Sequence, residues 1–149
     1  YDTNEENRKI AVALAAMWQA VGAKARLTNV DFGQLNRQVR TRNFTVARWV
    51  YFASYDDPYA LLSLVAGDNP NNYSGYANPK YDALLREANT LMDPARRMPV
   101  LMRAEQAMLA DHPVIPIYDY VRRHLVAERV TGWVPSERGP TPSRFLAVP

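Results

Sequence analysis

The stretch that most constrains the fold is FTVARWVYFASYDDP, residues 44–58. Apart from Arg48, residues 46–52 are apolar and rich in β-branched and aromatic side chains, a composition typical of strands. Near-continuous apolarity is expected of a strand that is covered on both faces. Asp-Asp-Pro then provides a turn that ends it. The segment predicts a buried strand that needs helices packed against it.

Helical patterns surround this strand. Apolar residues recur at three- and four-residue spacing in 3–22, 31–43, 80–91 and 94–112, and a shorter helix is predicted at 58–67. Thr3 and Glu6 form a capping-box pattern, Gly22 is a predicted stop, and Asp93 with Pro94 marks a helix start. Strand character is weaker at 23–30, returns at 113–130, and is lost from 131 onward. Helices alternating with strands predict an α/β layer architecture.

Composition excludes several classes of protein. The chain has 149 residues, of which 48% are hydrophobic and 22% charged, as expected for one globular domain. The net charge of +3 is scattered among acidic residues, so no nucleic-acid partner is expected. Because there is no cysteine, disulfides, thiolate metal sites and thiol nucleophiles are excluded. No apolar run reaches the roughly 20 residues of a membrane span, and a chain that begins with Tyr1 is expected to be a piece of a longer precursor.

Few residues indicate catalysis or metal binding. His112 and His124 occur in neither an H-x-x-x-H nor a G-x-S-x-G context, so we predict no catalytic residue, metal or cofactor. Asp56 and Asp57 are expected to form a turn and a helix N-terminus. The alternative is that one carboxylate faces a cationic ligand group. The methionines of 94–112 are expected in the core rather than in a recognition groove.

Aromatic side chains with polar tips gather beside the predicted loops. They suit a pocket that covers and hydrogen-bonds a ligand, and equally a core with a wet edge. Composition alone leaves both possibilities open. The residues concerned are Trp49, Tyr51, Phe52, Tyr55 and Tyr59 near the end of the strand, and Tyr73, Tyr76 and Tyr81 around the loop at 68–79.

Three stretches carry a resemblance to a known family. They are residues 9–62 (KIAVALAAMWQAVGA through SYDDPYALL), residues 71–88 (NNYSGYANPKYDALLREA) and residues 96–133 (RRMPVLMRAEQAMLADHPVIPIYDYVRRHLVAERVTGW). In uninterrupted order they resemble the C-terminal third of bacterial oligopeptide-binding proteins, the family 5 extracytoplasmic solute receptors of ABC importers. The motifs are specific in combination rather than singly.

The resemblance implies a fold and a division of the chain. The fold is the two-lobed α/β fold of type II periplasmic binding proteins, of which this chain would be a fragment. Residues 1–112 would form part of the ligand-binding lobe. Residues 113–130 would form the hinge crossing and return strand, and residues 131–149 a tail packed on the other lobe.

The resemblance also implies a ligand site. Phe32 matches an aromatic pocket position, Arg48 an arginine that meets a ligand carboxylate, and the strand around Trp49 and Val50 the backbone that pairs with an extended peptide. Pocket walls fall at Tyr51 and Phe52, and the cleft rim at Tyr73 and Tyr76. Where relatives commonly place an Asp for the peptide ammonium, this chain has Ser54. A hydroxyl is a weaker partner for that charge, and Asp56 is the candidate substitute.

The implied function is peptide uptake. A periplasmic receptor of this kind closes its lobes around a peptide or other polar solute and presents it to the membrane subunits of an ABC permease. The alternative is a ligand-sensing domain of a regulator with the same fold. An enzyme is disfavoured, because no set of nucleophile, base and orienting residue is present.

Overall fold

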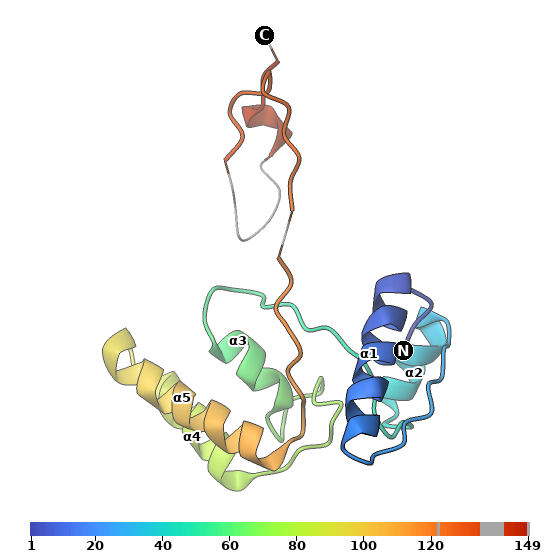
Figure 1. Ribbon diagram of the computed structural model, residues 1–149. Helices are drawn as coiled ribbons and strands as arrows, with labels where there is room; N and C mark the ends of the chain where they lie inside the picture. The colour runs from blue at the N-terminus through green and yellow to red at the C-terminus, as the bar shows by residue number, and fades with distance from the viewer. Residues whose placement is uncertain (122, 135–141, 149) are drawn as a thin grey trace. The chain divides into compact units, whose positions relative to one another are not determined.

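The computed structural model describes residues 1–121, 123–134 and 142–148. The chain divides into two compact units, Tyr1–Ile115 and Pro116–Pro149, and each is described by itself. The described helices of the first unit are α1 (Glu5–Ala20), α2 (Phe32–Arg40), α3 (Tyr59–Leu62), the 3-10 turn η1 (Ser63–Val65), α4 (Pro79–Thr90) and α5 (Pro94–Asp111) (Figure 1). In the second unit the 3-10 turn η2 spans Ser143–Phe145.

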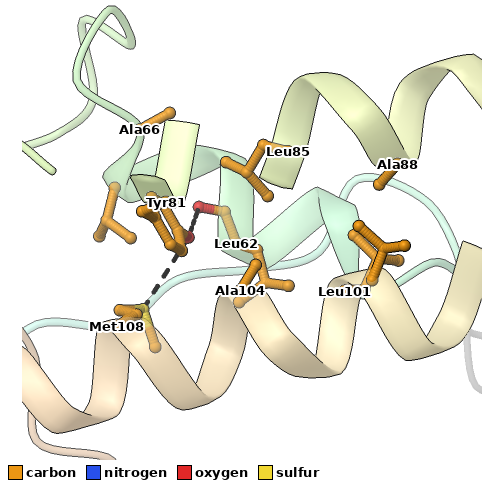
Figure 2. Packing of buried hydrophobic residues seen from close by; sticks show 10 residues of the cluster. Leu62, Ala66, Tyr81, Leu85, Ala88, Leu101, Ala104 and Met108 are labelled. Atoms are coloured by element: carbon orange, nitrogen blue, oxygen red, sulfur yellow. Dashed lines mark hydrogen bonds between the residues drawn. The ribbon is translucent and has the colours of Figure 1, made fainter. Parts of the chain in front are cut away.

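The core of the first unit lies between α3, η1, α4 and α5. Figure 2 shows the side chains of α4 and α5 meeting around Tyr81, which is fully buried. Its hydroxyl donates to the carbonyl of Leu62 at 2.6 Å, so the buried hydroxyl of Tyr81 has a hydrogen-bond partner. Ala88 and Ala104 are also fully buried, and such small side chains let helices approach closely. The cluster comprises Leu62, Val65, Ala66, Tyr81, Leu85, Ala88, Val100, Leu101, Ala104 and Met108.

Local capping chemistry fixes the helix ends, and the predicted signals at Asp93 and Gly22 are confirmed. Asp31 accepts from the amide of Gln34 at 2.9 Å to start α2, and Asp93 accepts from that of Ala95 at 3.0 Å to start α5. Gly22 follows the end of α1 with φ of +86°, a conformation that suits glycine.

Two local predictions are wrong. The cap of α1 is Asn4, whose side chain accepts from the amide of Glu6 at 2.8 Å, rather than Thr3. Only Met108 of the α5 methionines is buried, at 7% exposure, whereas Met98 and Met102 are 44% and 52% exposed. Periodicity could not separate these positions, because Met98 and Met102 lie beside the apolar face rather than on it.

The predicted strands are also wrong for the described residues of 23–30, 44–55 and 113–130. Within the described part of the chain, pairing is limited to isolated bridges, a parallel one between Asp2 and Val30 and an antiparallel one between Thr131 and Ala147. A strand forms only when a second backbone supplies its hydrogen bonds. The composition of 44–55 is that of a strand, but no segment among the described residues pairs with it.

The second unit contains an isolated antiparallel bridge. Thr131 and Ala147 exchange backbone hydrogen bonds of 2.9 and 3.1 Å. Gly132 has φ of +78°, and a Cβ added there would lie 1.8 Å from the carbonyl oxygen of Phe145. Glycine is therefore required at this position. Of the tail predicted at 131–149, residues 135–141 and 149 lie outside the described residues. None of the described helices has the length and apolarity needed to cross a bilayer.

Candidate functional site

Aromatic side chains from separate parts of the first unit form a continuous row. Phe32 and Trp49 stack with their ring centres 6.0 Å apart and 9° between their planes. Tyr73 meets the ring of Trp49 edge-on at 5.8 Å and stacks on Tyr51 at 6.4 Å. All of these separations fall in the range in which aromatic pairs attract. We call Phe32, Trp49, Tyr73 and Tyr51 the aromatic row.

Local structure explains how the row is assembled. Asp31 caps α2, so Phe32 is its first residue, and Phe32 is 60% exposed. Trp49 and Tyr51 are two residues apart, so in an extended segment they project to the same side. Three residues of the row were predicted as ligand-binding and Tyr73 as cleft rim. The structure brings the four together.

The loop that carries Tyr73 is organised by Asn72, which is 2% exposed. Its amide nitrogen donates to the carbonyls of Ala66 at 3.1 Å and Tyr76 at 2.7 Å. Its amide oxygen accepts from the hydroxyl of Ser74 at 2.9 Å and the amide of Tyr76 at 3.2 Å. Sequence reasoning missed this residue. The only signal was the asparagine-rich loop at 68–79, which does not say which asparagine is buried.

Two arginines, which the sequence analysis also missed, attach this loop to the end of α2. Arg42 donates to the carbonyl of Asn72 at 3.0 Å, and the Arg40 guanidinium lies 5.7 Å from the centre of the Tyr73 ring. The Tyr51 hydroxyl donates to the carbonyl of Asn71 at 3.3 Å. Burial, and to a smaller extent the neighbouring Tyr73, raises the pKa of Tyr51, so this phenol stays neutral and remains a hydrogen-bond donor.

Tyr76 has a different environment from Tyr73. Its ring packs edge-on against Tyr81 at 5.4 Å, and its hydroxyl donates to Asp111 at 2.8 Å. Burial and this hydrogen bond raise the pKa of Tyr76. Asn78 also donates to Asp111, at 2.7 Å. These contacts tie the loop to the end of α5, and the assignment of Tyr76 to a cleft rim stays a prediction.

The remaining predicted site residues lie along 48–56. Arg48 and Val50 are half-buried, whereas Phe52, Ser54 and Asp56 are exposed, Phe52 to 76%. Their roles stay predictions.

The predicted helix-start role is confirmed for Asp57. It accepts from the amide of Tyr59 at 2.8 Å and forms an ion pair with Arg97. Burial acts to raise the pKa of Asp57, but the hydrogen bonds from Arg97 and Tyr59 outweigh it and hold the pKa below its ordinary value. Arg97 also donates to the carbonyl of Ala88 at 3.0 Å, which ties the start of α3 to α4 and α5.

The described residues contain no group of three or more His, Cys, Asp or Glu side chains arranged to hold a metal ion. His112 follows the end of α5 in the left-handed conformation, with φ of +55°. This position is that of a helix cap.

Comparisons with known proteins were made by sequence and by structure. No protein-family model matches the chain. The periplasmic murein peptide-binding protein MppA of Escherichia coli is 31% identical over 134 residues, which cover 89% of this chain and 25% of that protein. The periplasmic oligopeptide-binding protein OppA of Salmonella typhimurium is 29% identical with the same coverage. The chain thus spans about a quarter of the length of these relatives.

Solved structures give the same result. The murein tripeptide-binding protein MppA of Escherichia coli matches with a TM-score of 0.88 and 29% identity, over 99% of this chain and 30% of that one. Haemophilus influenzae OppA, in complex with the peptide RPPGFSPFR, matches with a TM-score of 0.85 and 29% identity over the same shares. The predicted resemblance to bacterial oligopeptide-binding proteins, and with it the predicted two-lobed fold class, is confirmed by both comparisons.

Proposed function

We propose that this chain is part of a periplasmic receptor that binds peptides, or a similar polar solute, and presents them to the membrane subunits of an ABC permease. The observation that carries the proposal is the similarity, over nearly all of the chain, to proteins named for murein peptide and oligopeptide binding. The alternative, a sensory domain of a regulator, finds no support among these relatives.

The aromatic row supports a binding surface in the first unit. Phe32 is 60% exposed although it stacks on Trp49, so it presents an apolar face that a ligand can cover. The residues at 47–53 beside it have no strand partner among the described residues. An extended ligand could add to this segment by backbone hydrogen bonds, which give affinity with little dependence on ligand sequence.

The roles proposed for the individual site residues follow from the family resemblance. Arg48 meets a carboxylate of the ligand, Tyr51 and Phe52 form walls for its side chains, and Asp56 replaces the missing carboxylate at Ser54 as partner of the amine. Residues 1–112 belong to the binding lobe, 113–130 to the hinge crossing, and 131–149 to a tail on the other lobe.

The proposed mechanism has no chemical step. The relatives are solute-binding proteins. In such a receptor the ligand stabilises the closed form, because contacts from both lobes exist only in that form. The permease then accepts only receptors in the closed form, which are those that carry a ligand.

Calorimetric titration of the complete protein with tri- to pentapeptides tests this proposal. We expect free peptides to bind, and Trp49→Leu to weaken binding by at least about tenfold, or about 1.4 kcal/mol. The matched control is Trp18→Leu, since Trp18 lies on α1. Absence of peptide binding would refute peptides as the ligand, and equal affinities of the two variants would refute the role of the aromatic row in binding.

A second titration tests the amine partner. Free peptides should bind more tightly than N-acetylated ones, and Asp56→Asn should remove that difference while Asp68→Asn, at another exposed carboxylate, leaves it. A preference for free peptides that survives Asp56→Asn would place the amine partner elsewhere.

A further inference from the structure

Arg42 stands at a backbone position where glycine is the usual residue. It follows the end of α2 with φ of +55°, in the left-handed region that an L side chain adopts only at a cost. The amide of Arg42 donates to the carbonyl of Val39 at 3.1 Å, and the amide of Asn43 donates to that of Gln38 at 2.8 Å. This pair of bonds is typical of helix ends that have glycine in the place of Arg42. The helix end by itself therefore does not require an arginine side chain.

The Arg42 side chain contacts the loop that carries Tyr73. Its Nη2 atom donates to the carbonyl of Asn72 at 3.0 Å, across thirty residues of sequence. The same carbonyl accepts from the amide of Gly75 at 3.3 Å. Gly75 lies against the guanidinium, since a Cβ added there would be 3.4 Å from Nη1 and 3.5 Å from Cζ. These contacts bracket Tyr73 along the chain, one at the residue before it and one two residues after it.

α2 connects this tether to the other end of the aromatic row. Phe32 is the first residue of α2 and stacks on Trp49, while Arg42 follows the last turn. The nine residues of α2 span about 13 Å, and the hydrogen-bonded backbone of the helix holds its two ends at a fixed separation. Tyr73 meets the Trp49 ring edge-on at 5.8 Å. Trp49 is therefore contacted by one ring that belongs to α2 and by another that is tethered to it.

We propose that Arg42 is a positioning residue of the binding site, which holds Tyr73 against Trp49 before the ligand binds. The inference rests on the proposed peptide binding, and it assigns Arg42 no contact with the ligand. A large side chain that is already fixed spares the ligand the cost of immobilising it. The Arg40 guanidinium, 5.7 Å from the centre of the Tyr73 ring, adds a second contact from the same helix end.

Arg42→Gly separates this role from helix capping. Glycine suits the left-handed conformation, so α2 should keep its end and the melting temperature of the complete protein should change little. Peptide affinity, measured by calorimetric titration with tri- to pentapeptides, should fall by about threefold to tenfold. The matched control is Arg37→Gln, which removes one exposed charge from the last turn of α2 and should leave the affinity unchanged. Equal affinities of Arg42→Gly and Arg37→Gln would overturn the proposal.

A double-mutant cycle tests whether Arg42 acts through Tyr73. Once Tyr73→Leu has removed the ring, Arg42→Gly should weaken binding by less than about twofold further, because only the effects of independent residues add. Fully additive losses would mean that Arg42 acts on the ligand or on another part of the protein, and the positioning role would be wrong.

Trp49 fluorescence gives a readout that needs no ligand. The emission of Trp49 is the difference between the spectra of the complete protein and its Trp49→Phe variant. Arg42→Gly should shift this difference spectrum, because Tyr73 is no longer held against the Trp49 ring. An unchanged difference spectrum would overturn the proposal whether or not peptides bind. If the shift were observed but the unmodified protein bound no peptide, the proposed function would fail and the positioning of Tyr73 by Arg42 would stand.

Discussion

Asn72 offers a sharp test of how the loop beside the aromatic row is held. Its amide nitrogen donates to two carbonyls and its amide oxygen accepts from two donors. Asn72→Asp preserves the size of the side chain and its accepting oxygen, but it replaces the donor with an oxygen that faces the carbonyls of Ala66 and Tyr76. Asn72→Ala removes all four hydrogen bonds. The pair of variants therefore separates the donor from the acceptor function.

The expected loss of stability follows from the two carbonyls, of Ala66 and Tyr76, that lose their hydrogen-bond donor. A buried polar group left without a partner costs about 1–3 kcal/mol, and Asn72 is 2% exposed. Because one of the two bonds is only partly buried, we expect Asn72→Ala to lower the free energy of opening of the loop by about 2–4 kcal/mol. Asn72→Asp should cost at least as much, since it also buries a charge.

Hydrogen exchange measured by mass spectrometry on the complete protein can detect this change locally. Amides of residues 69–78 should exchange roughly 30 to 700 times faster in either variant, at about 1.4 kcal/mol per tenfold. The control is Asn43→Ala, an exposed asparagine outside the loop. If Asn72→Asp exchanged like the unmodified protein, the donor nitrogen would not be what organises the loop, and the reasoning would fail.

Three further substitutions have definite expectations. Gly132→Ala should open the bridge between Thr131 and Ala147, because an added Cβ would lie 1.8 Å from the carbonyl oxygen of Phe145; an unchanged rate of limited proteolysis at these residues would contradict this geometry. Tyr81→Phe should lower stability by about 1–3 kcal/mol, since its fully buried hydroxyl donates to a carbonyl of α3 at 2.6 Å; urea denaturation against a surface Tyr→Phe control measures it. Arg97→Met should make the stability of the protein depend less on pH in acid. The pKa of Asp57 is lowered in the folded protein, so ionised Asp57 stabilises the fold above its unfolded pKa, and this stabilisation is lost as the pH falls through its folded pKa. Melting temperatures between about pH 6 and pH 2 should therefore fall less in Arg97→Met, and an unchanged slope would show that the ion pair is not responsible.

The sequence predicted the helices and most of their ends. Asp93 and Gly22 act on an amide or a backbone angle within a few residues of themselves, so their effects can be inferred without any tertiary contact. The wrong cap at Thr3 is also a local effect: the neighbouring Asn4 caps a helix as well as Thr does, and it is the residue that caps α1. The family resemblance required no structure either, because it depends on the order of motifs.

The sequence did not predict what depends on contacts between distant segments. The apolar run at 44–55 has the composition of a strand, yet whether it pairs depends on a backbone elsewhere. The buried position of Asn72 and its neighbour's place in the aromatic row depend on Arg42, thirty residues away.

There is a physical reason why local features could be predicted from the sequence and contacts between distant segments could not. A helix closes its hydrogen bonds within four residues, so a local stretch of sequence contains nearly everything that determines it. Pairing, burial and the convergence of side chains are decided by residues far apart in the chain. For this protein the sequence by itself determined the helices, several of their ends and the family resemblance. Only the tertiary structure decided which aromatic rings meet, which asparagine is buried and which methionines reach the surface.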